Sequence, residues 1–283
     1  MLMSSAPLIS IITSTYNAAK ALPYTMRSIA EQTSRDYEWI VVDGGSTDGT
    51  VELLKHYGVL VSRWISEKDR GIYDAWNKAC RLARGQWLIF LGAGDELASA
   101  SVLQDVSHVL RSAYPAHEIV YGQLELISER ERKPLERVAR PWDEIKGKWQ
   151  FFKPYLPMHP ETFQHRTLFD GDEPFDLRFR FCADGHFLLR AFQRKPPLYI
   201  PVLIDRMPIG GVSTQPRNLL RIAGENRMIG AELGLRPPLL HTVLEGFKLV
   251  TKLAIAWLPP AVFRVLMDCF RVATGRKRRW SVR

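Results

Sequence analysis

The sequence predicts an α/β protein in which a mostly parallel, doubly wound sheet is flanked by helices. Short apolar runs typical of buried strands alternate with segments of about a dozen residues whose apolar side chains recur at helical spacing. The chain has 283 residues, of which 46% are hydrophobic and 24% are charged. This length and composition suit one large domain, or two halves that share a sheet.

In the first hundred residues the alternation is regular. The expected strands are apolar and β-branched, and they cover 8–15, 37–42, 59–66 and 87–91. The expected helices have apolar residues on one side, and they cover 18–32, about 46–56, and 71–83. Ser46 or Thr47 is the expected N-cap of the second helix. Neither GxGxxG nor GxxxxGK[ST] occurs, so neither a dinucleotide site nor a P-loop is supported.

The pattern is less regular after residue 98. We expect helices over 99–112 and 187–192, strands over 119–126 and 199–204, and a glycine turn over 209–213. The densely charged segment 129–140 is expected to be a solvated loop or hairpin. The segment 142–163 is rich in aromatics and prolines, which suits core packing or an irregular wall of a binding cleft.

The fourth expected strand ends in a conspicuous turn. Gly92-Ala93-Gly94 breaks the strand, and the acidic pair Asp95-Glu96 follows at once. Ligands of open α/β sheets bind just beyond the carboxyl ends of the strands. A carboxylate at this position is therefore well placed to meet a metal ion or a polar substrate, although a plain polar turn is the alternative.

The net charge of +9 is concentrated near the end of the chain. Residues 231–283 contain ten Lys or Arg and three Asp or Glu, which leaves the rest with only +2. No nucleic-acid motif accompanies this charge, so we expect no nucleic-acid partner. The cysteines number three (Cys80, Cys182 and Cys269) and lack metal-ligand spacing, which fits a reducing compartment. No signal peptide is recognised, and a cytoplasmic location is expected.

The basic segment also has two amphipathic stretches. Apolar residues over 243–258 and 262–270 recur near helical spacing, with Glu245, Lys248 and Lys252 expected on the opposite side of the first stretch. The stretches end in the basic run 276–279 and Trp280. These features predict a helical tail on an anionic membrane surface, at the inner face of the cell membrane. The alternative is a helix pair packed on its own domain.

Four stretches occur in a specific order: Ser-Thr-Tyr-Asn (14–17), Val-Val-Asp-Gly-Gly-Ser-Thr-Asp-Gly-Thr (41–50), Glu-Lys-Asp-Arg-Gly-Ile-Tyr-Asp-Ala-Trp-Asn-Lys (67–78), and Gly-Gln-Trp-Leu-Ile-Phe-Leu-Gly-Ala-Gly-Asp (85–95). With the Ala-Asp and Leu-Leu-Arg of residues 183–190, they resemble the family 2 inverting glycosyltransferases of the GT-A fold, of the bacterial cell-surface polysaccharide type. The resemblance covers about residues 6–215. It implies a nucleotide-sugar-binding half over 1–126 and an acceptor-binding and catalytic half over 127–230. The basic helical tail over 231–283 follows these two halves.

The resemblance also implies a nucleotide-diphosphate sugar donor and a glycan or lipid-linked acceptor. In this family the second acidic motif usually carries the catalytic base, which makes Asp184 the candidate; an N-cap for the helix 187–192 is its alternative. Family members generally hold Mg²⁺ or Mn²⁺ at the end of the fourth strand, which makes Asp95 the candidate metal ligand. The implied donor-binding residues are Ser14, Tyr16, Asp43, Asp69, Arg70 and Asp95.

Some positions stay open. Asp74 and Asn77 are either ligand contacts or exposed helix positions, and His159 and His186 are more often structural. Family members commonly have the sequence Asp-x-Asp-Asp where residues 92–95 of this chain are Gly-Ala-Gly-Asp. Because both carboxylates of the Asp-x-Asp are replaced, metal-free catalysis is an alternative. Gly44 also stands where a second acidic residue is common, which puts the nucleobase contact in question. A catalytically silent module that binds nucleotide-sugars is the alternative function.

Overall fold

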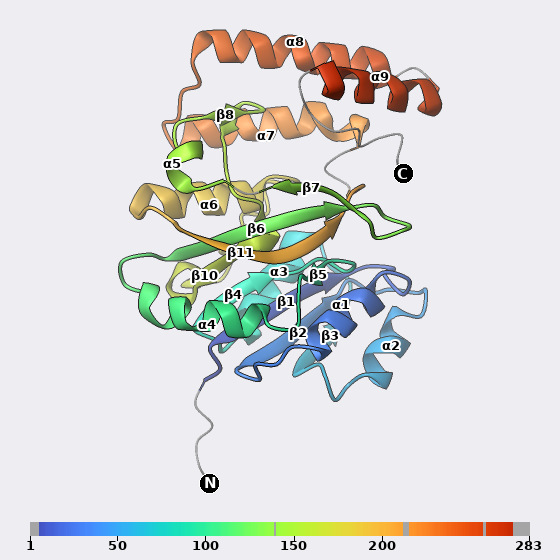
Figure 1. Ribbon diagram of the computed structural model, residues 1–283, viewed down its shortest axis with the longest axis vertical. Coiled ribbons are helices and arrows are strands. Elements are labelled where there is room, and N and C mark those ends of the chain that lie inside the picture. The colour runs from blue at the N-terminus through green and yellow to red at the C-terminus, as the bar shows by residue number, and fades with distance from the viewer. Residues whose placement is uncertain (1–5, 139, 212–214, 257–258, 274–283) are drawn as a thin grey trace. The chain divides into compact units, whose positions relative to one another are not determined.

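The computed structural model describes residues 6–138, 140–211, 215–256 and 259–273, and Figure 1 traces the chain through them. The chain divides into two compact units. The first comprises Met1–Leu124, Ala139–Trp142 and Pro157–Met207. The second comprises Glu125–Val138, Asp143–Leu156 and Pro208–Arg283.

The first unit contains the predicted strand–helix alternation. Four strands pair in parallel in the order β3-β2-β1-β4, which confirms the expected parallel sheet. The strands are β1 (Ile9–Thr15), β2 (Tyr37–Asp43), β3 (Arg63–Ser66) and β4 (Trp87–Phe90). The helices between them are α1 (Leu22–Ala30), α2 (Thr50–His56) and α3 (Ile72–Leu82).

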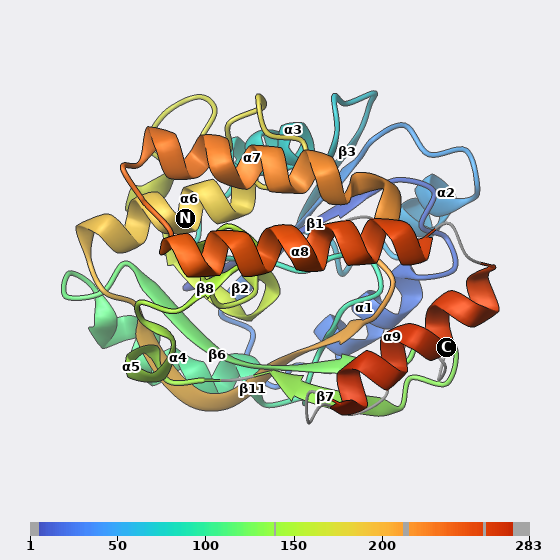
Figure 2. The ribbon, with the colours of Figure 1, turned by 90° about the horizontal axis from the view of Figure 1, so that it is seen from above.

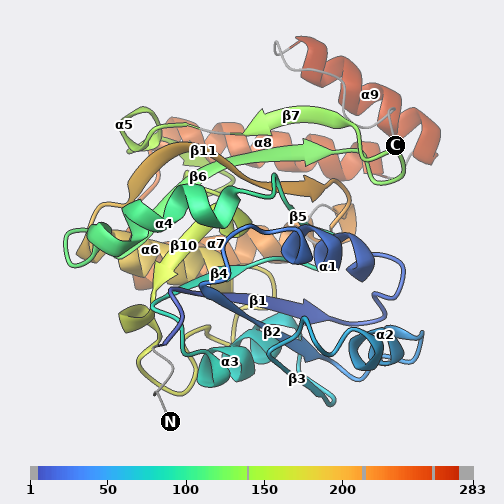
Figure 3. The ribbon, with the colours of Figure 1, turned by 60° about the horizontal axis from the view of Figure 1, so that its bottom comes forward.

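Helices cover both faces of this parallel sheet. Ile11, Trp39 and Leu91 belong to the core cluster that includes apolar residues of α1 and of α4 (Val102–Ala113). Phe90 packs instead on Trp76 of α3, with ring centroids 4.8 Å apart. Figure 3 shows α1 and α3 on opposite sides of β1 and β2. Strands β1, β2 and β4 are therefore buried on both faces, which is why they read as continuous apolar runs, whereas β3 at the sheet edge is only partly buried.

The sheet continues beyond β4 with antiparallel strands. Its full order is β3-β2-β1-β4-β10-β6-β11-β5, and β10 is antiparallel to both β4 and β6. The added strands are β5 (Glu96–Leu97), β6 (Ile119–Ile127), β10 (Thr162–His165) and β11 (Leu198–Pro208). The sequence predicts β6 and β11 but not β10, because β10 lies at the end of the proline-rich segment.

That proline-rich segment is irregular, as expected. It contains α5 (Trp142–Ile145), β8 (Trp149–Gln150), β9 (Lys153–Pro154) and the single 3₁₀ turn η1 (His159–Glu161). A second 3₁₀ turn, η2 (Arg166–Phe169), follows β10, and α6 (Ala183–Arg194) comes before β11.

The predicted cap of the second helix is wrong, and so is the alternative interpretation of Asp184 as a helix cap. Helix α2 begins after Gly49, which has a positive φ of 96°, whereas the Ser46 hydroxyl donates to Asp43. Helix α6 begins after Cys182 and is longer than expected. Asp184 therefore lies inside the first turn of α6 and is not the N-cap of a helix over 187–192. A carboxylate in a first helical turn is favoured by the helix dipole.

The second unit is built around three helices. The unpredicted helix α7 (Leu219–Glu232) follows η4 (Pro216–Asn218), and α8 (Leu239–Ala256) and α9 (Pro260–Ala273) confirm the helical tail. Figure 2 shows α7 and α8 running side by side. Phe152, Ala223 and Leu249 form a small core.

Strand β7 (Pro134–Val138) pairs with β6, so residues 129–138 of the charged segment contain the second strand of a hairpin. Residues 212–214 of the expected glycine turn, 257–258 of the first amphipathic stretch, and the basic end 274–283 lie outside the described residues. Among the described residues, no helix combines the length and apolarity needed to cross a membrane.

Candidate functional site

The predicted donor-binding residues gather at one edge of the parallel sheet. The strand register places Thr15 opposite Asp43 and Asp43 opposite Ser66, so β1, β2 and β3 end together. Open α/β sheets bind their ligands at this edge. The candidates that lie at or after the strand ends there are Ser14 and Tyr16 (β1), Asp43 (β2), Asp69 and Arg70 (β3), and Asp95 (β4).

Asp43 organises the loop that follows β2. Its Oδ1 accepts a hydrogen bond from Thr15 Oγ1 at 2.8 Å, and its Oδ2 accepts one from Ser66 Oγ at 2.7 Å. The backbone N–H groups of Gly45 and Ser46 donate to Oδ2 at 3.1 and 2.9 Å. Burial disfavours the charge, but the hydrogen bonds outweigh it and hold the pKa of Asp43 below its usual value. The carboxylate is therefore ionised and holds the loop in shape.

Asp69 and Arg70 lie between β3 and α3 in different environments. Asp69 is half-buried, and burial raises its pKa. The Arg70 side chain is 68% exposed and pairs with Asp74 at 3.0 Å and with Glu173 at 3.1 Å. Because Asp74 is only 7% exposed, its interpretation as an exposed helix position is wrong. Arg70 thus holds an exposed guanidinium against the first turn of α3.

Asn77 is also buried, which overturns the second expectation of an exposed position. Its amide donates to the Phe175 carbonyl at 2.8 Å and accepts from the Phe175 N–H at 2.9 Å. This paired contact fixes the loop before α6 to α3.

The turn that carries Asp95 is held by a hydrogen-bond network. Asp95 Oδ2 accepts from the Gly92 N–H at 2.7 Å. The Thr25 hydroxyl of α1 donates to the Asp95 carbonyl at 2.7 Å and accepts from the Gly94 N–H at 2.9 Å. Asp95 is 7% exposed. Thr25 is a residue that the sequence analysis missed, since nothing in the α1 pattern distinguishes it.

Asp184 is paired with a tyrosine from α3. Tyr73 Oη donates to Asp184 Oδ1 at 3.0 Å, and the Tyr73 side chain is buried. Burial, followed by the charge of Asp184, raises the pKa of Tyr73 well above its usual value. The tyrosine therefore stays protonated and donates to a carboxylate that is half-buried in the first turn of α6. The sequence hides this role, because Tyr73 lies on the apolar side of a helix.

His159 is a buried packing residue beside these groups. Its ring stacks on Trp76, with centroids 4.7 Å apart and planes 12° apart. Trp76 Nε1 donates in turn to Ser14 Oγ at 3.2 Å. Burial lowers the pKa of His159 to about 4, and the charge of Asp184 only partly opposes this. His159 is therefore neutral at pH 7, in agreement with the structural interpretation.

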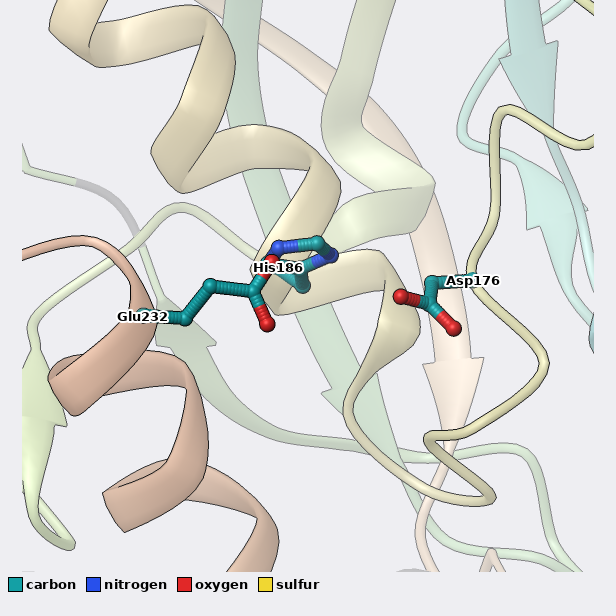
Figure 4. A group of neighbouring side chains, drawn as sticks. All are labelled: Asp176, His186 and Glu232. Atoms are coloured by element: carbon teal, nitrogen blue, oxygen red, sulfur yellow. The ribbon is translucent and has the colours of Figure 1, made fainter.

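His186 is buried in α6, and Asp176 lies in the loop before it, as Figure 4 shows. Ligand atoms of these two side chains lie within 4.8 Å of each other. Glu232, also drawn in Figure 4, belongs to the second unit. Hydrogen bonds from Arg178 hold the pKa of Asp176 below its usual value. Asp176 is thus an ionised partner of Arg178.

Comparison with known proteins places this geometry in a family. The model of the family described as glycosyl transferase family 2 matches residues 10–168. The chain belongs to this family. The family 2 chain is 33% identical to a PGL/p-HBAD biosynthesis glycosyltransferase of Mycobacterium bovis (strain BCG / Pasteur 1173P2). That alignment covers 97% of this chain and the whole length of the relative.

Solved structures show that this family 2 glycosyltransferase has the GT-A fold. The mannosyltransferase PcManGT of Pyrobaculum calidifontis, solved with GDP-Man and Mn²⁺, matches with a TM-score of 0.61 and 19% identity over 99% of this chain and 84% of that one. Residues 1–349 of S. aureus TarS, solved with UDP, match with a TM-score of 0.58 and 15% identity over 97% of this chain and 90% of that one.

Proposed function

We propose that this glycosyltransferase moves a sugar from a nucleotide-sugar donor to a hydroxyl of a glycan or lipid-linked acceptor of the cell envelope, with inversion. The observation that carries the proposal is the Tyr73–Asp184 pair, which joins a carboxylate of α6 to helix α3, just after the loop that carries Asp69 and Arg70. The similar proteins named above support the donor class. Residues 1–126 would bind the donor and residues 127–230 the acceptor.

Asp184 is the proposed general base. An acceptor hydroxyl attacks the anomeric carbon from the side opposite the diphosphate, so inversion follows from in-line displacement. The new bond joins the acceptor oxygen to that carbon, and the bond to the phosphate oxygen breaks with its electron pair. The hydroxyl proton passes to the Asp184 carboxylate. Tyr73 keeps that carboxylate in one orientation, which is the positioning that a proton acceptor needs.

The donor site is proposed at the carboxyl edge of the sheet. Ser14 and Tyr16 would contact the nucleoside, Arg70 would attract the diphosphate, and Asp43 would act through the loop that it shapes. Asp95 suits a divalent cation, because hard cations prefer carboxylate oxygen and are often held by one or two carboxylates together with substrate phosphates. Mg²⁺ or Mn²⁺ bound there would neutralise charge on the leaving diphosphate.

The substitution Asp184→Asn tests the base. We expect transfer to fall by about a hundredfold or more, because general base catalysis contributes about that much, while calorimetry gives unchanged donor affinity. Asp176→Asn is the matched control, since Asp176 is an acidic residue near the start of α6 whose partner is Arg178. Full turnover by Asp184→Asn would refute the assignment. Wild-type protein that binds donors but neither transfers nor hydrolyses them would instead favour the silent module.

The substitution Asp95→Asn tests the cation site without relying on activity. Mn²⁺ should raise the melting temperature of the wild-type protein with UDP or GDP, because a ligand of the native state stabilises it. The variant should lose this increment. An equal rise in melting temperature in both proteins would show that Asp95 is not a ligand of the cation. If Mn²⁺ does not change the melting temperature of a wild-type enzyme that transfers sugar, that result would support metal-free catalysis.

A membrane surface is the proposed location of the enzyme. Helix α8 exposes a row of apolar side chains at helical spacing, and the exposed fractions reach 72% at Phe247 and 66% at Val250. Glu245, expected on the side opposite the apolar residues, is buried and pairs with Lys248 at 2.8 Å. The row consists of Leu240, Val243, Leu244, Phe247 and Val250.

Monomeric soluble proteins rarely expose a continuous apolar row of this kind. The charge of +7 over residues 231–283 matches an anionic surface, such as the inner face of a cell membrane. We expect the protein to float with vesicles that contain phosphatidylglycerol and much less with pure phosphatidylcholine vesicles. Phe247→Asp should reduce flotation, whereas Tyr57→Asp, which alters an exposed aromatic residue after α2, should not. Equal flotation of both variants would contradict the membrane role.

A further inference from the structure

The guanidinium of Arg70 lies between two carboxylates that come from different parts of the chain. Its Nη2 donates to Asp74 Oδ1 at 3.0 Å and to Glu173 Oε1 at 3.1 Å. The Asp74 side chain is 10% exposed, and its Oδ2 also accepts from the Arg70 N–H at 3.1 Å. The Glu173 side chain, in contrast, is 52% exposed. Asp74 is therefore the firmly held partner of Arg70, and Glu173 is the partner that a ligand can displace.

The shape of a guanidinium decides what these two pairs mean for a phosphate. A guanidinium recognises a phosphate most strongly through two parallel N–H···O bonds. It can form such a fork with Nε and Nη2 or with Nη1 and Nη2, so both forks use Nη2. In Arg70 the two N–H groups of Nη2 already serve two carboxylates. Neither fork is therefore open to a phosphate until one carboxylate leaves, and Glu173 is the one held less firmly.

Glu173 lies in the loop between η2 and α6, and the backbone on both sides of it is fixed. Arg81 Nη1 donates to the Asp172 carbonyl at 3.0 Å. Phe175 is fully buried, and the side chain of Asn77 pairs with both its N–H and its carbonyl. Release of Glu173 from Arg70 therefore needs only a rotation of an exposed side chain, and helix α6 stays in place.

We infer that Glu173 holds the place of a donor phosphate on Arg70 and is displaced when the diphosphate binds. This inference rests on the proposed function, in which Arg70 attracts the diphosphate. A phosphate and Glu173 on one guanidinium would repel each other, which favours the exchange. The glutamate thus lowers the affinity for any nucleoside diphosphate and returns to Arg70 when the product leaves. Glu173 is a positioning residue, since it acts on the donor and the product through Arg70.

Calorimetry with UDP and GDP, in Mn²⁺ and at low ionic strength, tests this competition. Glu173→Gln should bind the nucleoside diphosphate about two- to fivefold more tightly than the wild type, because an exposed ion pair contributes about that factor. The gain should shrink as salt is added. Asp172→Asn is the matched control, since Asp172 is an exposed neighbour whose contact with Arg81 uses the backbone carbonyl. This control removes the same charge from the loop and should stay close to the wild-type affinity.

A double-mutant cycle with Arg70→Gln separates competition from a changed loop. In the Arg70→Gln background, Glu173→Gln should have no further effect, because the group for which it competes is gone. Equal affinity of Glu173→Gln and the wild type would overturn the inference, as would an equal gain from Asp172→Asn. Weaker binding by Glu173→Gln would also overturn it, because Glu173 would then hold Arg70 ready for the donor. A wild-type protein that binds no nucleoside diphosphate would overturn the proposed function itself.

Discussion

Replacement of Glu161 by glutamine should make the stability of this enzyme less sensitive to a rise in pH between about 5 and 8. Glu161 is only 2% exposed, and burial raises its pKa to about 8 against a weaker opposing effect of the Met158 N–H. That N–H donates to Oε1 at 2.8 Å, whereas Oε2 is buried without a hydrogen-bond partner among the described residues. The native side chain is therefore a neutral carboxylic acid at pH 7.

The sign of the effect follows from proton binding. The folded state keeps the Glu161 proton up to about pH 8, whereas the unfolded chain releases it near the usual value of 4.5. Between these limits the folded state holds more protons, so the free energy of unfolding decreases as pH rises. Each pH unit lowers it by a little over 1 kcal/mol, which amounts to about 4 kcal/mol between pH 5 and pH 8. Glutamine does not titrate and keeps the acceptor for Met158.

Urea denaturation at several pH values measures this difference. The free energy of unfolding of Glu161→Gln minus that of the wild type should rise steadily from pH 6.5 to pH 8. This pH range avoids the titration of His159. Because the pKa of His159 is lowered to about 4 in the folded state, this histidine reduces the free energy of unfolding only as pH falls below 6.5. Glu131→Gln is the control, because Glu131 is exposed and pairs with Lys133. A difference that stays constant with pH would refute the argument.

Three further substitutions probe the site and its support. Tyr73→Phe removes the hydrogen bond to Asp184 and should lower kcat about tenfold. Calorimetry should show unchanged affinity for the donor. A parallel loss of donor affinity would contradict the positioning role of Tyr73. Thr25→Val removes the hydroxyl that accepts from the Gly94 N–H and donates to the Asp95 carbonyl, and it should lower the free energy of unfolding in urea by about 1–3 kcal/mol. Thr25→Ser should lower it less. Gly85→Ala puts a Cβ 2.5 Å from the Ser10 backbone nitrogen of β1 and should lower the melting temperature strongly. Gly224→Ala has open space around the new Cβ and should not lower it. Equal melting temperatures of the two variants would contradict the packing argument.

The parallel sheet and its helices could be predicted because their apolar patterns are uninterrupted. Helix α3 was expected over 71–83 and extends over Ile72–Leu82. Helix α7 was missed because its buried side includes polar residues. Glu225 is 5% exposed and pairs with Arg221, and Asn226 is 1% exposed and donates to the Phe151 carbonyl at 2.9 Å. Those buried polar groups interrupt the apolar period from which a helix is predicted.

The candidate site could be predicted only where a motif marks it. The motifs indicate Asp184 and Asp95 as candidates, but the contacts that hold these two residues in place are long-range. Tyr73 lies 111 positions from Asp184, and Thr25 lies 70 positions from Asp95. The Ser46 cap was wrong for a related reason, since the Asp43 carboxylate binds the Ser46 hydroxyl that would have capped the helix. A local sequence pattern does not show which of two possible hydrogen-bond partners a side chain will bind.

The glycines at two strand ends leave room for neighbouring carboxylates. A Cβ at Gly44 would meet Asp69 Oδ2 at 2.5 Å, and a Cβ at Gly92 would meet Asp95 Oδ2 at 2.9 Å. Backbone N–H groups hold both carboxylates in place, since Gly71 donates to Asp69 Oδ1 and Gly92 donates to Asp95 Oδ2. The loops at this edge of the sheet therefore fix the orientation of the acidic side chains before any ligand binds, which is the preorganisation that the proposed donor site requires.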